Sequence, residues 1–171
     1  ARMPRRRLDF EATRDSILAV CGTLDQTIGG RPVDIVAKTT APRRTIYGFI
    51  DRQNLPGLFR TFDFASPDIS SPQRYETTVP QQALFLLNSP FMLDQARALL
   101  RRPEIGDQTE PAEKVRALYQ VVLGRDATAE EIQRGESFVK TAINEPNRSQ
   151  LSAWQRYGQA LMLTNEFVYV D

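Results

Sequence analysis

The sequence predicts a mainly α-helical protein, a compact orthogonal bundle of several helices with one long, ordered but irregular loop. Several segments repeat apolar residues at helical spacing behind good capping residues, whereas no segment shows a pattern for strand pairing. One stretch, residues 54–79, is instead rich in proline and serine. A length of 171 residues suits one domain, so residues 1–171 are expected to form a single helical domain.

Composition excludes several functions before any motif is considered. Lys and Arg number 22 and Asp and Glu number 21, a balance that predicts no nucleic-acid binding by the whole domain. The absence of histidine excludes Ser-His-Asp and Cys-His catalysis, and with a single cysteine it excludes zinc sites built from these residues. No internal disulfide or haem attachment motif can form. Cys21 lies among aliphatic residues and is predicted to be a buried small hydrophobe.

The first residues are expected to be a basic lead-in. Residues 1–8 carry four arginines, which suit either a solvated lead-in or a phosphate-binding arm. They include no apolar run of signal-peptide length, and no stretch of the chain approaches the length of a membrane span. We expect the sequence to be a piece of a longer chain.

The first helix is predicted over about residues 9–24. Asp9 suits its N-cap, and Gly29-Gly30 with Pro32 rule out its continuation. The short apolar run at 44–52 fits a helix or a strand, and periodicity does not decide between them; a helix is slightly favoured.

Residues 54–79 are predicted to form an ordered irregular wrap. Prolines and Gly57 interrupt regular structure there, whereas a disordered segment would be poor in aromatic residues. Phe59, Phe62 and Phe64 are therefore expected to anchor this segment on the helices.

A corner between two helices is predicted at Asn88-Ser89-Pro90. Thr78 is expected to cap the helix before it, with Pro80 in the first turn, and Ser89 with Pro90 to start the next helix. The first of these helices is so apolar, through Ala83, Leu84, Leu86 and Leu87, that we expect it to be central.

Three further helices complete the prediction. One begins at Thr109-Glu110-Pro111 and ends at Gly124, and a capping box of Thr128 and Glu131 opens the next. Ser149 is expected to open the last helix, and the final residues, NEFVYVD, are expected to form an extended, partly buried tail.

No catalytic residue, metal ligand or cofactor is assigned from the sequence, but polar residues gather in and beside the wrap. Asp63, Asp68 and Glu76 could supply carboxylates for glycoside hydrolysis, although turn formation explains them more simply. Arginines and neutral hydrogen-bonding side chains could bind an anionic saccharide, although packing of the wrap is the favoured interpretation. The candidate ligand-binding residues are Arg43, Arg44, Asp63, Arg74, Glu76, Thr77, Thr78, Gln81, Gln82 and Asn88.

Several stretches resemble one known family in their order along the chain: RLDFEATRDSILAVCGTLD, RRTIYGFIDR, TFDFASPDISSPQRYETTVPQQALFLLNSPFMLDQARALL, ALYQVVLGRDATAEEI and LTNEFVYVD. They resemble the C-terminal part of planctomycete-specific domain one, a domain of unknown function found behind cytochrome-c-like domains. The resemblance implies an exported bacterial protein, periplasmic or on the cell surface, with a haem-binding module elsewhere in the polypeptide. It carries over no established activity.

The favoured hypothesis is a non-enzymatic helical module that packs against upstream domains of the same polypeptide. The first alternative is binding or hydrolysis of an anionic polysaccharide at the Arg, Asp and Gln cluster beside the wrap. The second, which rests on the resemblance alone, is support of electron transfer by a neighbouring haem module.

Overall fold

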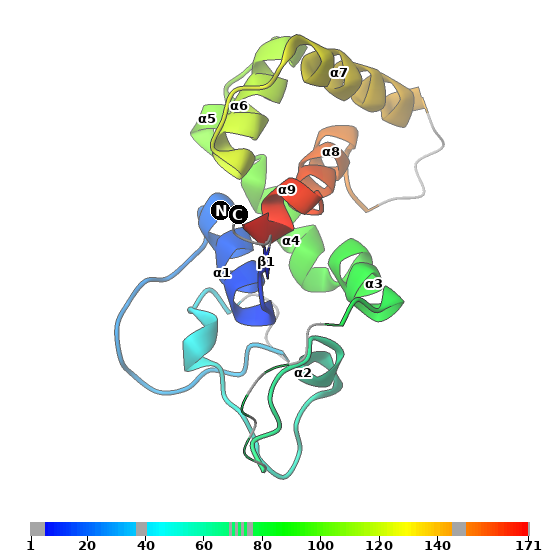
Figure 1. Cartoon of the computed structure of the whole chain (residues 1–171). Coiled ribbons are helices and arrows are strands. Elements are labelled where there is room, and N and C mark those ends of the chain that lie inside the picture. The colour runs from blue at the N-terminus through cyan, green and yellow to red at the C-terminus, as the bar shows by residue number, and fades with distance from the viewer. Residues whose placement is uncertain are drawn as a thin grey trace, which may run out of the picture.

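The computed structural model describes residues 6–36, 41–68, 70, 72, 74, 77–144 and 150–170, and it confirms the mainly helical class. Figure 1 shows helices packed around α4, with the first and last described residues close together. Its elements are β1 (Arg6–Arg7), α1 (Phe10–Val20), the 3-10 turn η1 (Thr45–Tyr47), α2 (Gly57–Thr61), α3 (Pro80–Asn88), α4 (Pro90–Leu99), α5 (Pro103–Gly106), α6 (Pro111–Leu123), α7 (Ala129–Asn144), α8 (Ala153–Met162), α9 (Asn165–Val168) and β2 (Tyr169–Val170). None of the described helices is long and apolar enough to cross a membrane.

The larger hydrophobic cluster joins α1, α4, α6 and α8. Ile17, Met92, Leu99, Leu118 and Met162 are almost completely buried in it. Cys21 belongs to the same cluster, as predicted, and burial raises the pKa of its thiol to about 12. These helices therefore supply the main apolar stabilisation of the fold.

A smaller cluster lies where the wrap meets α1. Phe59 of α2 is fully buried there, with its ring centroid 5.5 Å from that of Phe10 and 5.0 Å from that of Phe64. Phe62 is half-buried and lies 5.1 Å from Phe10. The described part of the wrap is thus attached to α1 through aromatic contacts.

Most predicted helix ends are confirmed. The side chains of Asp9 and Ser89 accept hydrogen bonds from backbone N–H groups in the first turns of α1 and α4. Gly124 ends α6 with a φ of 70°, and Thr128 and Glu131 form the predicted capping box. Helix α1 stops before residue 24, because Gly22 has a φ of 70° that continues no right-handed helix.

Other local predictions are wrong. Val79, whose side chain makes no hydrogen bond, occupies the N-cap position of α3 in place of Thr78. Helix α8 begins at Ala153 behind a capping box formed by Ser152 and Gln155, whereas Ser149 lies outside the described residues. The run at 44–52 holds the three-residue turn η1 and an isolated parallel bridge between Gly48 and Val33. Residues 57–61 of the irregular stretch form α2.

The end of the chain also differs from the predicted extended tail. Residues 165–168 form the short helix α9, and only Tyr169 and Val170 are extended. They pair antiparallel with β1, with Arg6 opposite Val170 and Arg7 opposite Tyr169. A two-residue strand leaves no alternation in the sequence, so periodicity could not have predicted this pairing.

Helix α3 is peripheral, which contradicts the prediction that it is central. Leu84 and Leu87 expose 56% and 48% of their surface, and only Gln82 and Leu86 of this helix are buried. The C-terminal end of α3 is held by Gln159 of α8, which donates hydrogen bonds to the Leu86 and Leu87 carbonyls. Helix α3 itself carries mostly apolar side chains, but neighbouring elements cover it on one side only.

Candidate functional site

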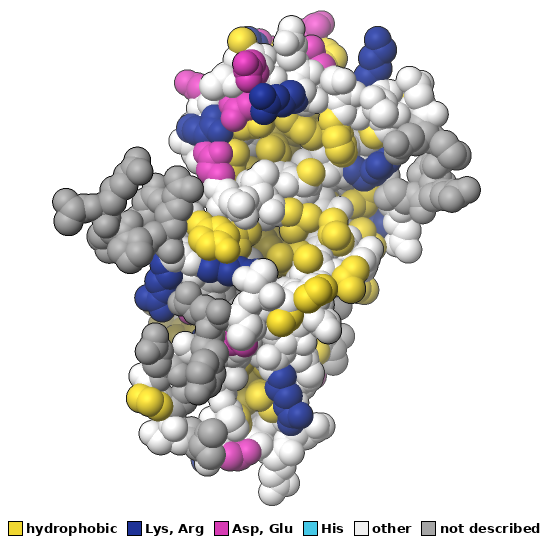
Figure 2. Space-filling model, turned by 45° about the vertical axis from the view of Figure 1, so that its right-hand side comes forward, with side chains coloured by type: hydrophobic (Ala, Val, Ile, Leu, Met, Phe, Trp, Pro, Cys, Tyr) yellow, Lys and Arg dark blue, Asp and Glu magenta, His cyan; other side chains and the backbone are white. Residues whose placement is uncertain are grey.

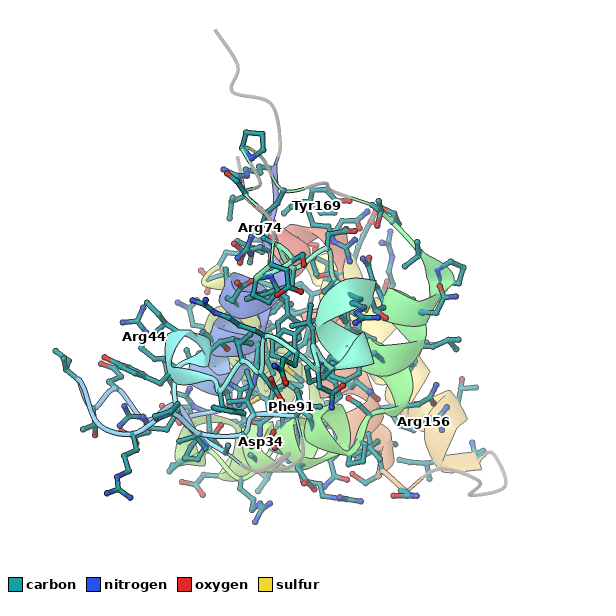
Figure 3. All side chains as sticks on the ribbon, turned by 90° about the horizontal axis from the view of Figure 1, so that it is seen from below. Asp34, Arg44, Arg74, Phe91, Arg156 and Tyr169 are labelled. Atoms are coloured by element: carbon teal, nitrogen blue, oxygen red, sulfur yellow. The ribbon has the colours of Figure 1, made fainter. Side chains whose placement is uncertain are left out.

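Five of the candidate residues line one cavity of about 190 Å³ between β1, the wrap and the start of α3. Figure 3 shows Arg74 and Tyr169, which both line this cavity, on the same side of the molecule and away from Arg44. We call this group the polar cluster: Asp63, Arg74, Thr77, Thr78 and Gln82.

Asp63 connects the end of α2 to the segment that leads into α3. Its carboxylate accepts hydrogen bonds of 2.7 and 2.8 Å from the backbone N–H and the hydroxyl of Thr77. Asp63 has a φ of 57°, a left-handed conformation that aspartate tolerates better than most residues. Both carboxylate oxygens are therefore used to position the chain.

Arg74 connects the wrap to α1. Its guanidinium donates two hydrogen bonds, 2.9 and 2.8 Å long, to the carboxylate of Glu11 and lies 4.9 Å from the centre of the Phe64 ring. The bond with Glu11 raises the pKa of Arg74. Arg74 is thus a charged anchor that is already paired within the chain.

Gln82 is the buried centre of the polar cluster. Its amide nitrogen donates to the carbonyls of Thr61 and Thr77, at 2.8 and 3.2 Å. Its amide oxygen accepts a hydrogen bond of 2.6 Å from Arg7 of β1. One side chain thus connects the first strand, the wrap and α3.

The structure separates Arg43, Arg44 and Asn88 from the polar cluster. Arg43 lies 4.4 Å from the centre of the Tyr47 ring and bonds the Gly29 carbonyl, and the half-exposed Arg44 lies 3.8 Å from Asp15. Asn88 is the last residue of α3 and is exposed. Glu76 lies outside the described residues.

Gln81 faces a different and larger cavity of about 420 Å³. The walls of this apolar cavity come from α1, α2, residues 35 and 36, α3 and the start of α4. Phe91, at the start of α4, is one of the lining residues and is labelled in Figure 3. Gln81 therefore contributes to a second site, although its neighbour Gln82 belongs to the first.

Sequence reasoning missed two arginines. Arg7 was treated as part of the basic lead-in, yet it completes the polar cluster. Arg14 is buried on α1 and donates to the carbonyls of Ala41 and Arg43 and to the Thr45 hydroxyl. No local pattern marks a buried arginine, because its partners lie far away along the chain.

The hydrogen bonds of the polar cluster hold chain segments together. Arg74 and Gln82 bond partners in other segments, and Asp63 bonds Thr77, 14 residues further along the wrap. Among the described residues, no three His, Cys, Asp or Glu side chains are placed to share a metal ion. The polar cluster thus connects β1, α1, the wrap and α3.

The comparisons with known proteins identify the family of the chain. Neither the curated proteins nor the solved structures give a match. The family model PSD1, described as a protein of unknown function (DUF1553), matches residues 1–139, most of the sequence. The chain therefore belongs to the PSD1 (DUF1553) family.

Proposed function

We propose that this chain is a non-catalytic helical interaction module whose α3 surface docks onto another part of the same polypeptide. The observation that carries the proposal is the exposure of Leu84 and Leu87, 56% and 48% respectively, on one helix. The two residues are three positions apart and share a helix face. Contiguous exposed apolar side chains of this kind are typical of association surfaces.

The charge pattern supports the same proposal. Residues 77–93 include no Asp, Glu, Lys or Arg, although charged residues make up 25% of the chain. Figure 2 shows hydrophobic side chains gathered over the face that carries α3. Because no charge has to be desolvated on α3, an apolar partner surface can cover it at little electrostatic cost.

The polar cluster holds the α3 surface in a fixed position. Gln82 and Thr77 hold the start of α3 to Thr61 and Arg7, and Gln159 holds its end to α8. A preorganised helix loses less conformational entropy on binding than a mobile one. The candidate polar residues thus contribute to docking by holding α3 in place.

The proposed partner is an upstream domain of the longer polypeptide. The resemblance to planctomycete-specific domain one favours an exported protein with a haem-binding module. In that setting the chain could also support electron transfer by the haem module. Unchanged haem reduction after deletion of this domain would remove that accessory role.

The docking proposal predicts that charge on α3 weakens binding to the preceding region of the polypeptide. Leu84→Glu with Leu87→Glu is expected to weaken binding by about tenfold or more, because two carboxylates would be desolvated at the interface. Isothermal titration calorimetry with the separately expressed upstream region measures this effect. Ile28→Glu is the matched control, since Ile28 is 89% exposed but lies outside α3. Equal affinity of the α3 variant and the wild type would contradict the proposal.

We also propose saccharide binding at the polar cluster as a second candidate. Its support is the gathering of Asp63, Arg74 and Gln82 around one cavity beside the aromatic ring of Tyr169. A glycan array with the wild type and with Arg74→Lys and Thr78→Ala tests this candidate. Binding that survives in both variants, with unchanged melting temperatures, would remove the polar cluster from saccharide recognition.

A further inference from the structure

The apolar cavity is a second, separate feature of the fold. It lies between the two hydrophobic clusters and has a volume of about 420 Å³. Apolar side chains of Ile17, Leu58, Phe62, Phe85 and Phe91 form much of its wall. The cavity opens to the surface, and its volume and apolar lining are in the range of small-molecule sites.

Water is a poor occupant for most of this space. Thr13, Thr61 and Ser89 are the hydroxyl groups in its wall, and each already has a hydrogen-bond partner in the backbone. Water that enters this open cavity therefore contacts mostly apolar side chains. An apolar molecule therefore fits the cavity better than water does.

Arg14 is the one charged residue that the described part of the chain contributes to the wall, and its charge restricts which apolar molecule fits. The Arg14 guanidinium lies 5.4 Å from the centre of the Phe91 ring and is held by Ala41, Arg43 and Thr45. Its pKa is lowered, chiefly by burial. A positive charge in a desolvated wall favours a neutral or anionic ligand over a cationic one.

Gln81 gives the cavity a polar edge. This side chain is exposed, in contrast to the buried Gln82 beside it, and it faces the same space as Phe85 and Leu86. Its amide can donate to and accept from a polar group at one end of a ligand. Small-molecule sites combine an apolar lining with a few placed polar groups in this manner.

We propose that the apolar cavity binds a small molecule with a body of two or three fused rings and a neutral or anionic polar end. The size follows from volume, since a cavity of about 150 Å³ already accommodates benzene. The rings would lie among Phe62, Phe85 and Phe91, and the polar end would meet Gln81. This site is independent of the docking surface, because Leu84 and Leu87 do not line it.

Three naphthalene probes that differ only in their polar end test the ligand class. 2-Naphthoate and 2-naphthamide are expected to bind, and 2-naphthylmethylammonium is expected to bind about tenfold more weakly than the carboxylate. Binding is followed by probe fluorescence, and intermolecular NOEs to methyl groups of Ile17, Leu58 and Leu86 in the wild type locate the site. Absence of binding, NOEs confined to Leu84 and Leu87, or a preference for the ammonium probe would overturn the proposal.

Two variants distinguish the cavity from the docking surface. Leu58→Trp fills the cavity from the half-buried side chain of α2 and is expected to weaken 2-naphthoate binding by about tenfold or more. Leu84→Ala removes part of the docking surface and should leave this binding unchanged. The reverse pattern would contradict the cavity site. Should Leu58→Trp not fold, the NOEs in the wild type still decide the question.

Discussion

At the scale of single residues, the polar cluster depends on side chains that do two things at once. Asp63 adopts a left-handed backbone conformation and also bonds both the N–H and the hydroxyl of Thr77. Alanine offers neither the tolerance for this conformation nor the acceptor oxygens. Asp63 therefore fixes the direction in which the wrap leaves α2.

Replacement of Asp63 should separate these two contributions. Asp63→Ala is expected to lower the free energy of unfolding by about 1–2 kcal/mol, because it loses the bonds to Thr77 and adds backbone strain. Asp63→Asn, which keeps an acceptor and tolerates a positive φ, should lose less. Urea unfolding measures both values. Asp68→Ala is the exposed control and should change stability by less than about 0.5 kcal/mol. Equal stability of Asp63→Ala and the wild type would contradict this role.

At the scale of elements, helices α6, α7 and α8 approach one another at a glycine. A Cβ atom at Gly135 of α7 would lie 2.6 Å from the Tyr157 hydroxyl oxygen and 2.8 Å from a Val115 methyl carbon. Both distances are shorter than van der Waals contact, so the helices can meet only because residue 135 has no side chain. Nothing in the sequence pattern marks this contact, since an isolated helical glycine otherwise only lowers helix propensity.

Alanine at position 135 should therefore be destabilising despite its higher helix propensity. Gly135→Ala is expected to lower the free energy of unfolding by about 1–3 kcal/mol, because α7 must move away from Tyr157 and Val115. Gly57→Ala on α2 is the matched control, since a Cβ there meets no heavy atom within 4 Å. That control should be neutral or stabilising by up to about 1 kcal/mol. Thermal unfolding of both variants checks the contrast, and a stabilised Gly135→Ala protein would contradict it.

The connection between α6 and α7 also has its own charge network. Arg125 donates two hydrogen bonds, 2.8 and 2.9 Å long, to Glu131 of α7 and also bonds Glu166 of α9. These bonds hold the pKa of Glu131 at about 2 and lower the pKa of Glu166. Because both pKa values are lower than in an unfolded chain, this contribution to stability is present near neutral pH. It is lost as the pH falls from about 5 toward 2.

Removal of Arg125 should make the stability of the protein less dependent on pH in the acid range. Arg125→Gln is expected to lower the melting temperature more at pH 7 than at pH 3, since the carboxylates lose the partner that keeps them ionised. Arg134→Gln breaks an exposed pair with Glu130 on the same helix and should have little effect at either pH. Melting curves across this pH range decide the point. Parallel pH profiles for Arg125→Gln and the wild type would contradict the network's role.

At the scale of the whole molecule, the sequence predicts what is local and misses what depends on distant neighbours. The helix caps at Asp9 and Ser89 are recognisable because a cap is made within one turn. Asp63, Arg74 and Gln82 were singled out by their setting in a polar stretch, but their partner Arg7 is distant in sequence. The peripheral place of α3 was mispredicted for the same reason, since composition alone does not say how many sides of a helix are covered.

The arrangement of the whole molecule places these features in relation to one another. Strands β1 and β2 connect the two ends of the described chain, and β1 supplies Arg7 to the polar cluster. The polar cluster in turn holds the start of α3, whose exposed leucines lack charged neighbours on the helix. The docking proposal rests on this surface, which is apolar, fixed and uncovered.

Hydrogen exchange of the α3 amides, compared between this chain and the proposed longer polypeptide, tests the docking proposal most directly. We expect slower exchange over residues 83–88 in the longer polypeptide, because a docked partner would cover Leu84 and Leu87. The buried helix α6 should exchange equally in both samples and serves as the internal reference. Identical exchange of α3 in the two samples would contradict docking at α3.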